Sequence, residues 1–449
     1  MSELAIINDF VQNFAFVFMR FWWLWSFFVL ILTVPSLWLA YVQETWKRKN
    51  PSVLLEFKIP REVRKGPRAM EQVFLTIHAL RSEPQEFDAW KMFPAYFKET
   101  WLDGEVTLWY TFEVTSFGGE IHFYAHVPVK HRNMIEASLY AHYSDIQISE
   151  VADDYIYRMP STFDKLVAAG YNLFGTEFTL DKKKGDAYPI RTYIDFEAVA
   201  EEKEFDPISA LLETLAKVKP QETVWLQIIA RPVKTAWIKK AEETIDKVKE
   251  RAARKPIVTE EGETVFTTAA PGEIEAMKAI ARKISKPGFE TLIRTVYISP
   301  KESHDTNFGQ RGVFSALNQY ATESYNKFVQ NPFAWTRRSV WYPPYFFPKT
   351  RVRSAKRRML NNYRKRVTFP ETRFGTVLRA SGNIFSFNPW SFGRMILNVE
   401  ELATIFHLPT YLIQTGPLIK VGESRKVGPP AGLPIYGESD ESQLPPGIK

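Results

Sequence analysis

VTLWYTFEVTSFGGEIHFYAHVPV, residues 106–129, contains two runs of aromatic and β-branched residues separated by Phe117-Gly118-Gly119. Such runs are typical of β-strands, and a short connection that contains glycine is typical of a β-hairpin. The sequence therefore predicts strands at 106–116 and 120–129 that pair across this turn. The segments on either side of the hairpin then decide which kind of sheet it belongs to.

The hairpin is flanked by segments that alternate between strand and helix patterns. Residues 52–60 predict a strand and residues 67–79 a helix with apolar residues on one face. After the hairpin, residues 130–142 predict a helix and 144–151 a strand. The order βαββαβ is that of a split-βαβ, ferredoxin-like unit. We expect such an α+β domain at residues 51–155, with an antiparallel sheet and two helices on one face.

Residues 156–330 contain segments of the same kinds. Strands are expected where β-branched and aromatic residues gather, at 176–180, 188–196, 222–232 and 289–300. Helices are expected at 207–217, 233–254, 272–285 and 314–329. We expect a second α+β unit here, although no strict sequence repeat supports a duplication of the first.

Residues 21–42 (FWWLWSFFVLILTVPSLWLAYV) form an uncharged run that is followed by Lys47-Arg48-Lys49. As a helix, a run of this length covers about 33 Å, enough for a hydrocarbon core of about 30 Å. Tryptophans near its ends are typical of an interfacial belt, and the basic cluster predicts a cytoplasmic C-terminal side. Residues 1–50 are thus expected to hold a single transmembrane helix, in a cell inner membrane with most of the chain cytoplasmic; the alternative is a long buried helix.

The charge of the chain is concentrated in one segment. The formal net charge is +7, but residues 337–366 contain 11 Lys and Arg and no Asp or Glu, so the rest of the chain is mildly acidic. Within this segment, residues 352–366 (VRSAKRRMLNNYRKR) place apolar residues on one helical face and basic residues around the rest. The sequence predicts a basic amphipathic helix in a C-terminal region, 331–427, that begins with a connector rich in proline and aromatic residues.

The basic helix has several interpretations. Its partner can be a phosphate backbone, an anionic membrane surface or an acidic protein, and the alternative is a helix that packs by its apolar side and leaves its charges in water. The candidate binding residues are Arg337, Arg338, Arg351, Arg353, Lys356, Arg357, Arg358, Arg364, Lys365 and Arg366. Aromatic residues that could stack on single-stranded bases are Trp335, Trp341, Tyr342, Tyr345 and Tyr363.

The sequence contains none of the common catalytic motifs. It has no GxxxxGK[ST], GxGxxG, GxSxG or HExxH pattern. The absence of cysteine removes disulfides, thiolate metal ligands and cysteine nucleophiles. His122 and His126 share a face of one expected strand, but ordinary sheet histidines explain them better than a metal site does. We predict a protein that is not an enzyme, with no catalytic residue, cofactor or metal.

Residues 397–434 (LNVEELATIFHLPTYLIQTGPLIKVGESRKVGPPAGLP) contain two short motifs, L-N-x-E-E-L-A-T-x-F-H-x-P and PPxxLP. Together they resemble the linker ahead of the motor domain in conjugation-type, type IV secretion-like ATPases of the HerA–FtsK superfamily, as found in ultra-small uncultivated bacteria. The residues that match are Leu397, Asn398, Glu400, Glu401, Leu402, Ala403, Thr404, Phe406, His407, Pro409, Pro429, Pro430, Leu433 and Pro434.

The resemblance implies a membrane anchor, an α+β body and a linker that serve a P-loop ATPase. The sequence has no Walker motif, so ATPase activity is not carried over, and we expect either a stand-alone subunit or a split gene. The expected function is a membrane anchor or adaptor of a type IV secretion or conjugation-like apparatus that docks a separate ATPase. The expected docking residues are Glu400, Glu401, Phe406, His407 and Pro409, followed by a Pro/Gly-rich tail at 428–449.

Two alternatives to the adaptor stay open. The first is a membrane-tethered module that binds nucleic acid through residues 337–366. The second is an envelope scaffold that binds neither an ATPase nor nucleic acid. A steep salt dependence of DNA binding would distinguish the first alternative from the other two functions.

Overall fold

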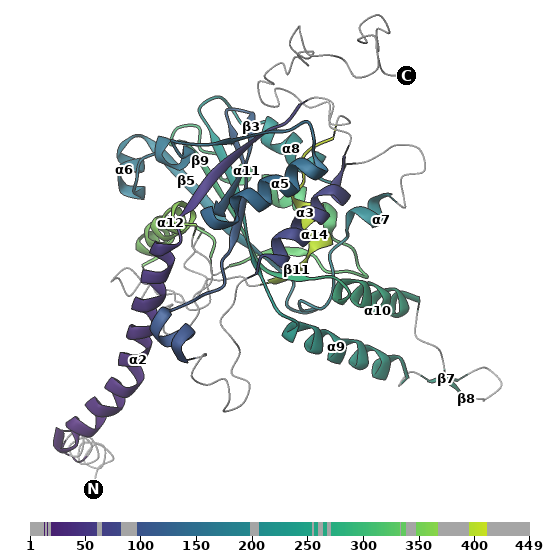
Figure 1. Ribbon diagram of the computed structural model, residues 1–449, viewed down its shortest axis with the longest axis horizontal. Helices are drawn as coiled ribbons and strands as arrows, with labels where there is room; N and C mark the ends of the chain where they lie inside the picture. Colours follow the sequence, from purple (N-terminus) through teal and green to yellow (C-terminus); the bar gives the residue numbers. More distant parts are fainter. Residues whose placement is uncertain are drawn as a thin grey trace, which may run out of the picture.

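The computed structural model in Figure 1 describes most of the chain between residues 19 and 410. The described residues are 13, 16, 19–60, 65–81, 97–197, 206–253, 256–258, 264–266, 271–332, 334–337, 347–366 and 395–410. Arg338, the aromatic residues Trp341, Tyr342 and Tyr345, and the tail at 428–449 lie outside them.

The first α+β unit has the chain order expected from the sequence. Its elements are β1 (Ser52–Lys58), α3 (Pro67–Ala79), β2 (Tyr110–Phe117), β3 (Glu120–Pro128), α5 (Arg132–His142) and β4 (Gln147–Glu150). The strands lie in the order β4-β1-β3-β2, and all neighbours are antiparallel. The βαββαβ part of the predicted fold therefore agrees with the structure.

The second unit repeats this strand order. Its elements are β5 (Tyr171–Leu180), α8 (Ser209–Ala216), β6 (Thr223–Pro232), β9 (Gly288–Pro300), α11 (Thr306–Leu317) and β10 (Phe328–Gln330). The order β10-β5-β9-β6 corresponds strand for strand to β4-β1-β3-β2. A helical hairpin, α9 (Ala236–Ala253) and α10 (Pro271–Ile284), is inserted between β6 and β9 and carries a small β7–β8 ribbon (Pro256–Val258, Thr264–Phe266).

The two units join through β2 and β6. These strands pair antiparallel from Tyr110 opposite Ala230 to Phe117 opposite Thr223. Both are buried along almost their whole length, as expected of strands that are covered on both faces. The result is one continuous sheet with nine strands among the described residues, in which β11 (Met395–Asn398) pairs with β9 beyond the end of β5.

Helices cover both faces of the centre of this sheet. On one face, α3, α5, α8, α11 and α14 (Val399–Ile405) pack over a large apolar core that includes Phe74, Phe123 and Phe406. On the other face lie α6 (Phe163–Ala168) and α12 (Pro348–Arg364), over Trp225 and its neighbours. Because successive strand residues point to opposite faces, β6 contributes to both cores.

Two secondary-structure predictions are wrong. Residues 188–196, expected as a strand, lead into the short helix α7 (Tyr193–Glu197), where the Asp195 carboxylate accepts a hydrogen bond from the backbone N–H of Thr192. The helix expected at 314–329 is instead α11, which starts at Thr306 because the Asp305 side chain caps its first turn.

The predicted transmembrane helix is also wrong. Residues 22–49 form one helix, α2 (Trp22–Lys49), which projects from the body in Figure 1. Among the described residues, no helix has both the length and the apolar character that crossing a bilayer requires. The C-terminal part of the expected span packs against the rest of the protein on one side, where Leu39 and Val42 are buried and the Trp38 indole donates to the carbonyl of Trp101 at 2.9 Å.

Candidate functional site

A row of buried polar side chains crosses the sheet beneath α12. Glu113, Gln227, Arg294 and Glu177 are paired in register on the neighbouring strands β2, β6, β9 and β5. The Arg294 guanidinium donates to Glu177 Oε1 and to Gln227 Oε1, each at 3.0 Å. The Gln227 amide in turn donates to Glu113 Oε1 at 2.8 Å. These contacts form a continuous hydrogen-bonded chain across four strands.

The C-terminal end of α12 closes over this row. Arg366 donates to both carboxylate oxygens of Glu113, at 2.8 and 2.9 Å, and to Asp154 at 2.7 Å. The hydroxyl of Tyr155 also donates to Glu113, at 2.8 Å. Burial alone would lower the pKa of Arg366, but the adjoining carboxylate of Glu113 raises it well above its usual value. The buried charges are paired with one another, so they hold α12 on the sheet.

Four of the nine described basic residues that were predicted to bind a partner serve this internal packing. Arg351 and Arg366 are buried, and the pKa of Arg358 is lowered by burial despite the nearby carboxylate of Glu177. Arg364 donates to the backbone carbonyls of Ile156 and Met159, at 2.6 and 3.2 Å. The remaining described candidates keep exposed or half-exposed side chains: Arg337, Arg353, Lys356, Arg357 and Lys365.

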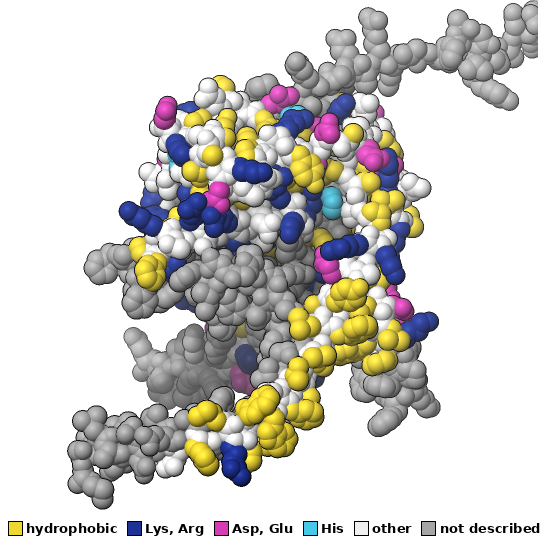
Figure 2. Space-filling view, turned by 90° about the vertical axis from the view of Figure 1, so that its left-hand side faces the viewer, with side chains coloured by type: hydrophobic (Ala, Val, Ile, Leu, Met, Phe, Trp, Pro, Cys, Tyr) yellow, Lys and Arg dark blue, Asp and Glu magenta, His cyan; other side chains and the backbone are white. Residues whose placement is uncertain are grey.

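Two of these accessible side chains, Arg353 and Lys356, line a cleft between α12 and α6, which we call the α12 cleft. It has a volume of about 350 Å³ and is lined by Phe163, Asp164, Val167, Asn172, Lys301, Lys349, Val352, Arg353 and Lys356. Figure 2 shows this side of the molecule, on which Lys and Arg side chains gather over the body while hydrophobic side chains follow the projecting helix. Four cations thus face a single carboxylate in the α12 cleft.

The contacts inside the α12 cleft leave its positive charge largely uncompensated. Asp164 accepts hydrogen bonds from Arg353 at 2.7 Å and forms an ion pair with Arg357 at 2.6 Å, so two guanidinium groups share one carboxylate. Lys356 donates to the neutral side chain of Asn172 at 2.7 Å. Burial lowers the pKa of Lys356 to about 8, because a half-buried ammonium group loses part of its hydration.

Two lysines of the α12 cleft, Lys301 and Lys349, were not among the predicted binding residues. Lys349 lies in the predicted segment but before the predicted helix, whereas α12 begins at Pro348 and places Lys349 in its first turn. Lys301 follows directly after β9, far from α12 in the sequence, and donates to the carbonyl of Val167 at 2.7 Å. The sequence predicted the strand that precedes Lys301, but it did not show that this strand ends beside α12.

The expected stacking residues do not contribute to this surface. Tyr363 is fully buried against Trp225, with ring centroids 5.3 Å apart. Trp335 is half-buried. An exposed aromatic side chain that does contact α12 is Tyr157, whose ring lies 5.3 Å from the guanidinium of Arg364.

The expected ATPase-docking residues are all buried in the body. Glu401 pairs with Lys283 at 3.1 Å, and both side chains are fully buried. Glu400 lies 2.9 Å from the ammonium of Lys286, and Phe406 and Pro409 are buried as well. The motif therefore ties α14 into the fold and offers no accessible side chain for a partner.

His407, the remaining expected docking residue, pairs with a buried carboxylate. Its Nε2 lies 2.6 Å from Asp206, which also accepts hydrogen bonds from the backbone and hydroxyl of Thr410. Burial alone would raise the pKa of Asp206, but these contacts lower it to about 2. This pair fixes the end of the motif against the segment that leads into α8.

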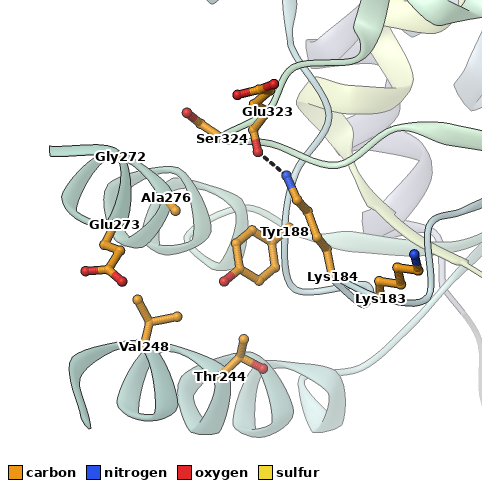
Figure 3. A pocket seen from close by; sticks show the side chains of 10 residues that line it. All are labelled: Lys183, Lys184, Tyr188, Thr244, Val248, Gly272, Glu273, Ala276, Glu323 and Ser324. Carbon is orange, nitrogen blue, oxygen red and sulfur yellow. Dashed lines mark hydrogen bonds between the residues drawn. The ribbon is translucent and has the colours of Figure 1, made fainter. Parts of the chain in front are cut away.

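A second cavity, of about 400 Å³, lies where α9 and α10 meet the body (Figure 3). Lys184 points across it, but its ammonium group donates to the backbone carbonyls of Glu323 and Tyr325. The lining contains two lysines and two glutamates, Lys183, Lys184, Glu273 and Glu323. Because the charges are balanced, this cavity favours no charged ligand.

The described residues contain no group of three His, Asp or Glu side chains that could hold a metal ion. The imidazole of His122 is hydrogen-bonded to Glu56 at 2.9 Å, across two neighbouring strands. This contact agrees with an ordinary sheet histidine.

Comparison with known proteins gives a family without an assigned activity. No curated protein matches the chain. A family model described as "Domain of unknown function (DUF8128)" matches residues 50–418, which include both α+β units, α12 and α14. The chain belongs to the DUF8128 family.

Proposed function

We propose that this protein is a non-enzymatic nucleic-acid-binding platform that holds phosphate groups at the α12 cleft. The observation that supports it is the excess of positive charge there, with four cations around one carboxylate. Lysine and arginine are the side chains that bind phosphate backbones most often. This function was the alternative expected for the basic segment, without the membrane tether.

The electrostatic environment of the Lys356 ammonium group supports a phosphate ligand. Its ammonium group is partly dehydrated, and its closest hydrogen-bond acceptor, Asn172, carries no charge. A phosphate oxygen near Lys356 would supply the missing counter-charge and raise its pKa again.

The test is DNA binding by the full chain as a function of salt, measured by fluorescence anisotropy. The logarithm of the association constant should fall linearly with the logarithm of the salt concentration. Lys349→Gln should weaken binding and reduce that slope by about 1. Asp164→Asn should strengthen binding, because it releases Arg353 and Arg357 from their shared carboxylate.

Lys247→Gln is the matched control, because Lys247 is an exposed lysine on α9, far from α12 in the fold. It should leave the affinity and the slope unchanged. Binding without salt dependence, or an equal loss in the control, would contradict the proposal.

A second candidate function is the adaptor for a HerA–FtsK-type ATPase, which rests on the resemblance of residues 397–434. Because the motif residues described here are buried, a docking surface has to lie elsewhere. The α9–α10 hairpin is suited to that role, since it projects from the body and most of the described polar side chains of α9 are exposed. Co-purification of the ATPase with the full chain, and its loss on deletion of residues 236–284, would support this function.

A further inference from the structure

We propose that the α12 cleft takes single-stranded nucleic acid, with the ring of Tyr157 stacking on a base. This inference rests on the proposed nucleic-acid binding and names the form of the ligand. Three features carry it: a row of cations along α12, an exposed aromatic ring at the end of that row, and the size of the α12 cleft that part of the row lines.

The cations follow one side of α12. Lys349, Arg353 and Arg357 are spaced four residues apart, which places them on the same face at intervals of about 6 Å. Arg353 and Arg357 contact Asp164 on α6. Arg364, further along the helix, contacts the segment just before α6. A row of positive charge therefore follows the line where α12 meets residues 155–168, and a flexible phosphate backbone can follow it too.

Tyr157 lies at the end of this row. Its side chain is 74% exposed, the highest value among the large hydrophobic side chains of the described residues. The guanidinium of Arg364 lies over the ring at 5.3 Å, which holds the ring in place by a cation–π contact. A fixed aromatic ring next to phosphate-binding cations is the arrangement by which proteins bind single strands without sequence preference.

The shape of the α12 cleft favours a single strand over a duplex. A volume of about 350 Å³ between two helices suits one nucleotide at a time. Its lining includes the apolar side chains of Phe163 and Val167 and the polar side chain of Asn172. A duplex presents its phosphates on a stiff convex surface and keeps its bases stacked inside, so its bases cannot reach this lining or the ring of Tyr157.

The experiment compares three probes on the full chain at one salt concentration: a labelled single-stranded oligonucleotide, its duplex, and an abasic oligonucleotide of equal length. The single strand should bind more tightly than both others. Tyr157→Ala should weaken single-strand binding about tenfold and leave abasic binding unchanged, whereas Tyr157→Phe should keep the affinity. Tyr140→Ala is the matched control, since Tyr140 is an exposed tyrosine on α5, across the sheet.

The outcomes separate this inference from the function on which it rests. If no probe binds in a salt-dependent way, the proposed nucleic-acid binding fails. If all three probes bind equally and Tyr157→Ala changes nothing, the α12 cleft is a general polyanion site and the single-strand inference is overturned. Preference for the duplex would overturn it as well.

Discussion

Glu113 and Arg366 form the main polar contact between α12 and the sheet, and they lie 253 residues apart in the sequence. Both side chains are almost completely buried. Removing one partner of such a pair leaves the other charge buried without compensation, which is far more costly than removing both.

Glu113→Gln should therefore lower the free energy of unfolding by roughly 3–5 kcal/mol, while Glu113→Gln combined with Arg366→Met should recover most of that loss. Urea unfolding of the two variants and the wild type measures both effects. Additive losses in the double variant would mean that the pair is not coupled.

The residues of α12 show how far side-chain placement could be predicted. The apolar stripe of the helix was recognised, and Ala355, Met359, Leu360 and Tyr363 are indeed buried. The burial of Arg351 and Arg366 was not predicted, and Arg366 lies beyond the end of α12, where helical spacing no longer applies. The partner of Arg366 could not be predicted, because Glu113 reads as an ordinary strand residue until the sheet register is known.

At the scale of elements, the patterns that depend on local sequence were the reliable ones. The helix expected at 67–79 has the bounds of α3, and the strands expected at 222–232 and 289–300 lie within one residue of β6 and β9. The strand prediction for residues 188–196 was wrong because contacts with residues distant in the sequence decide their conformation. The backbone N–H of Ile190 donates to Glu401 and that of Tyr193 to Thr404, both on α14.

Phosphate binding by α12 should depend on the protonation state of one of its side chains, Lys356. Lys356 has a pKa of about 8 in the fold, so its ammonium group is charged below that pH and loses its charge above it. DNA affinity should therefore fall as the pH rises from 7 to 9, by about the contribution of one phosphate contact.

Lys356→Arg is the control for this pH dependence, since arginine stays protonated throughout that range. Anisotropy titrations of both proteins at pH 7, 8 and 9 measure the difference. A wild-type affinity that is constant across this range would show that Lys356 does not contact the ligand.

For the whole molecule, both α+β units could be expected from the sequence, but not their union into one sheet. β2 and β6 carry no proline before their last residue and few charges, so neither is protected as an exposed edge strand would be. The lack of such protective residues in the sequence indicates that each of the two strands has a neighbour on both sides. It does not say that they are each other's neighbours.

Because the sheet is continuous, the two units should unfold together. Ile228→Pro should destabilise the protein by about 3 kcal/mol or more, since proline in a central strand removes a ladder hydrogen bond. Hydrogen exchange should then show lost protection in β1 and β3, although neither strand pairs with β6. Retained protection there would show that the first unit is stable by itself.

The strands at the two ends of the sheet, β4 and β10, have only four and three residues. Unpaired backbone N–H and C=O groups on a long outer strand would offer a template for another chain to add to, and ends this short offer almost none. Fibril growth through strand addition is thereby disfavoured in a protein with so much β-structure. Among the described residues, we therefore expect an assembly partner to recognise side chains and projecting helices rather than the two end strands.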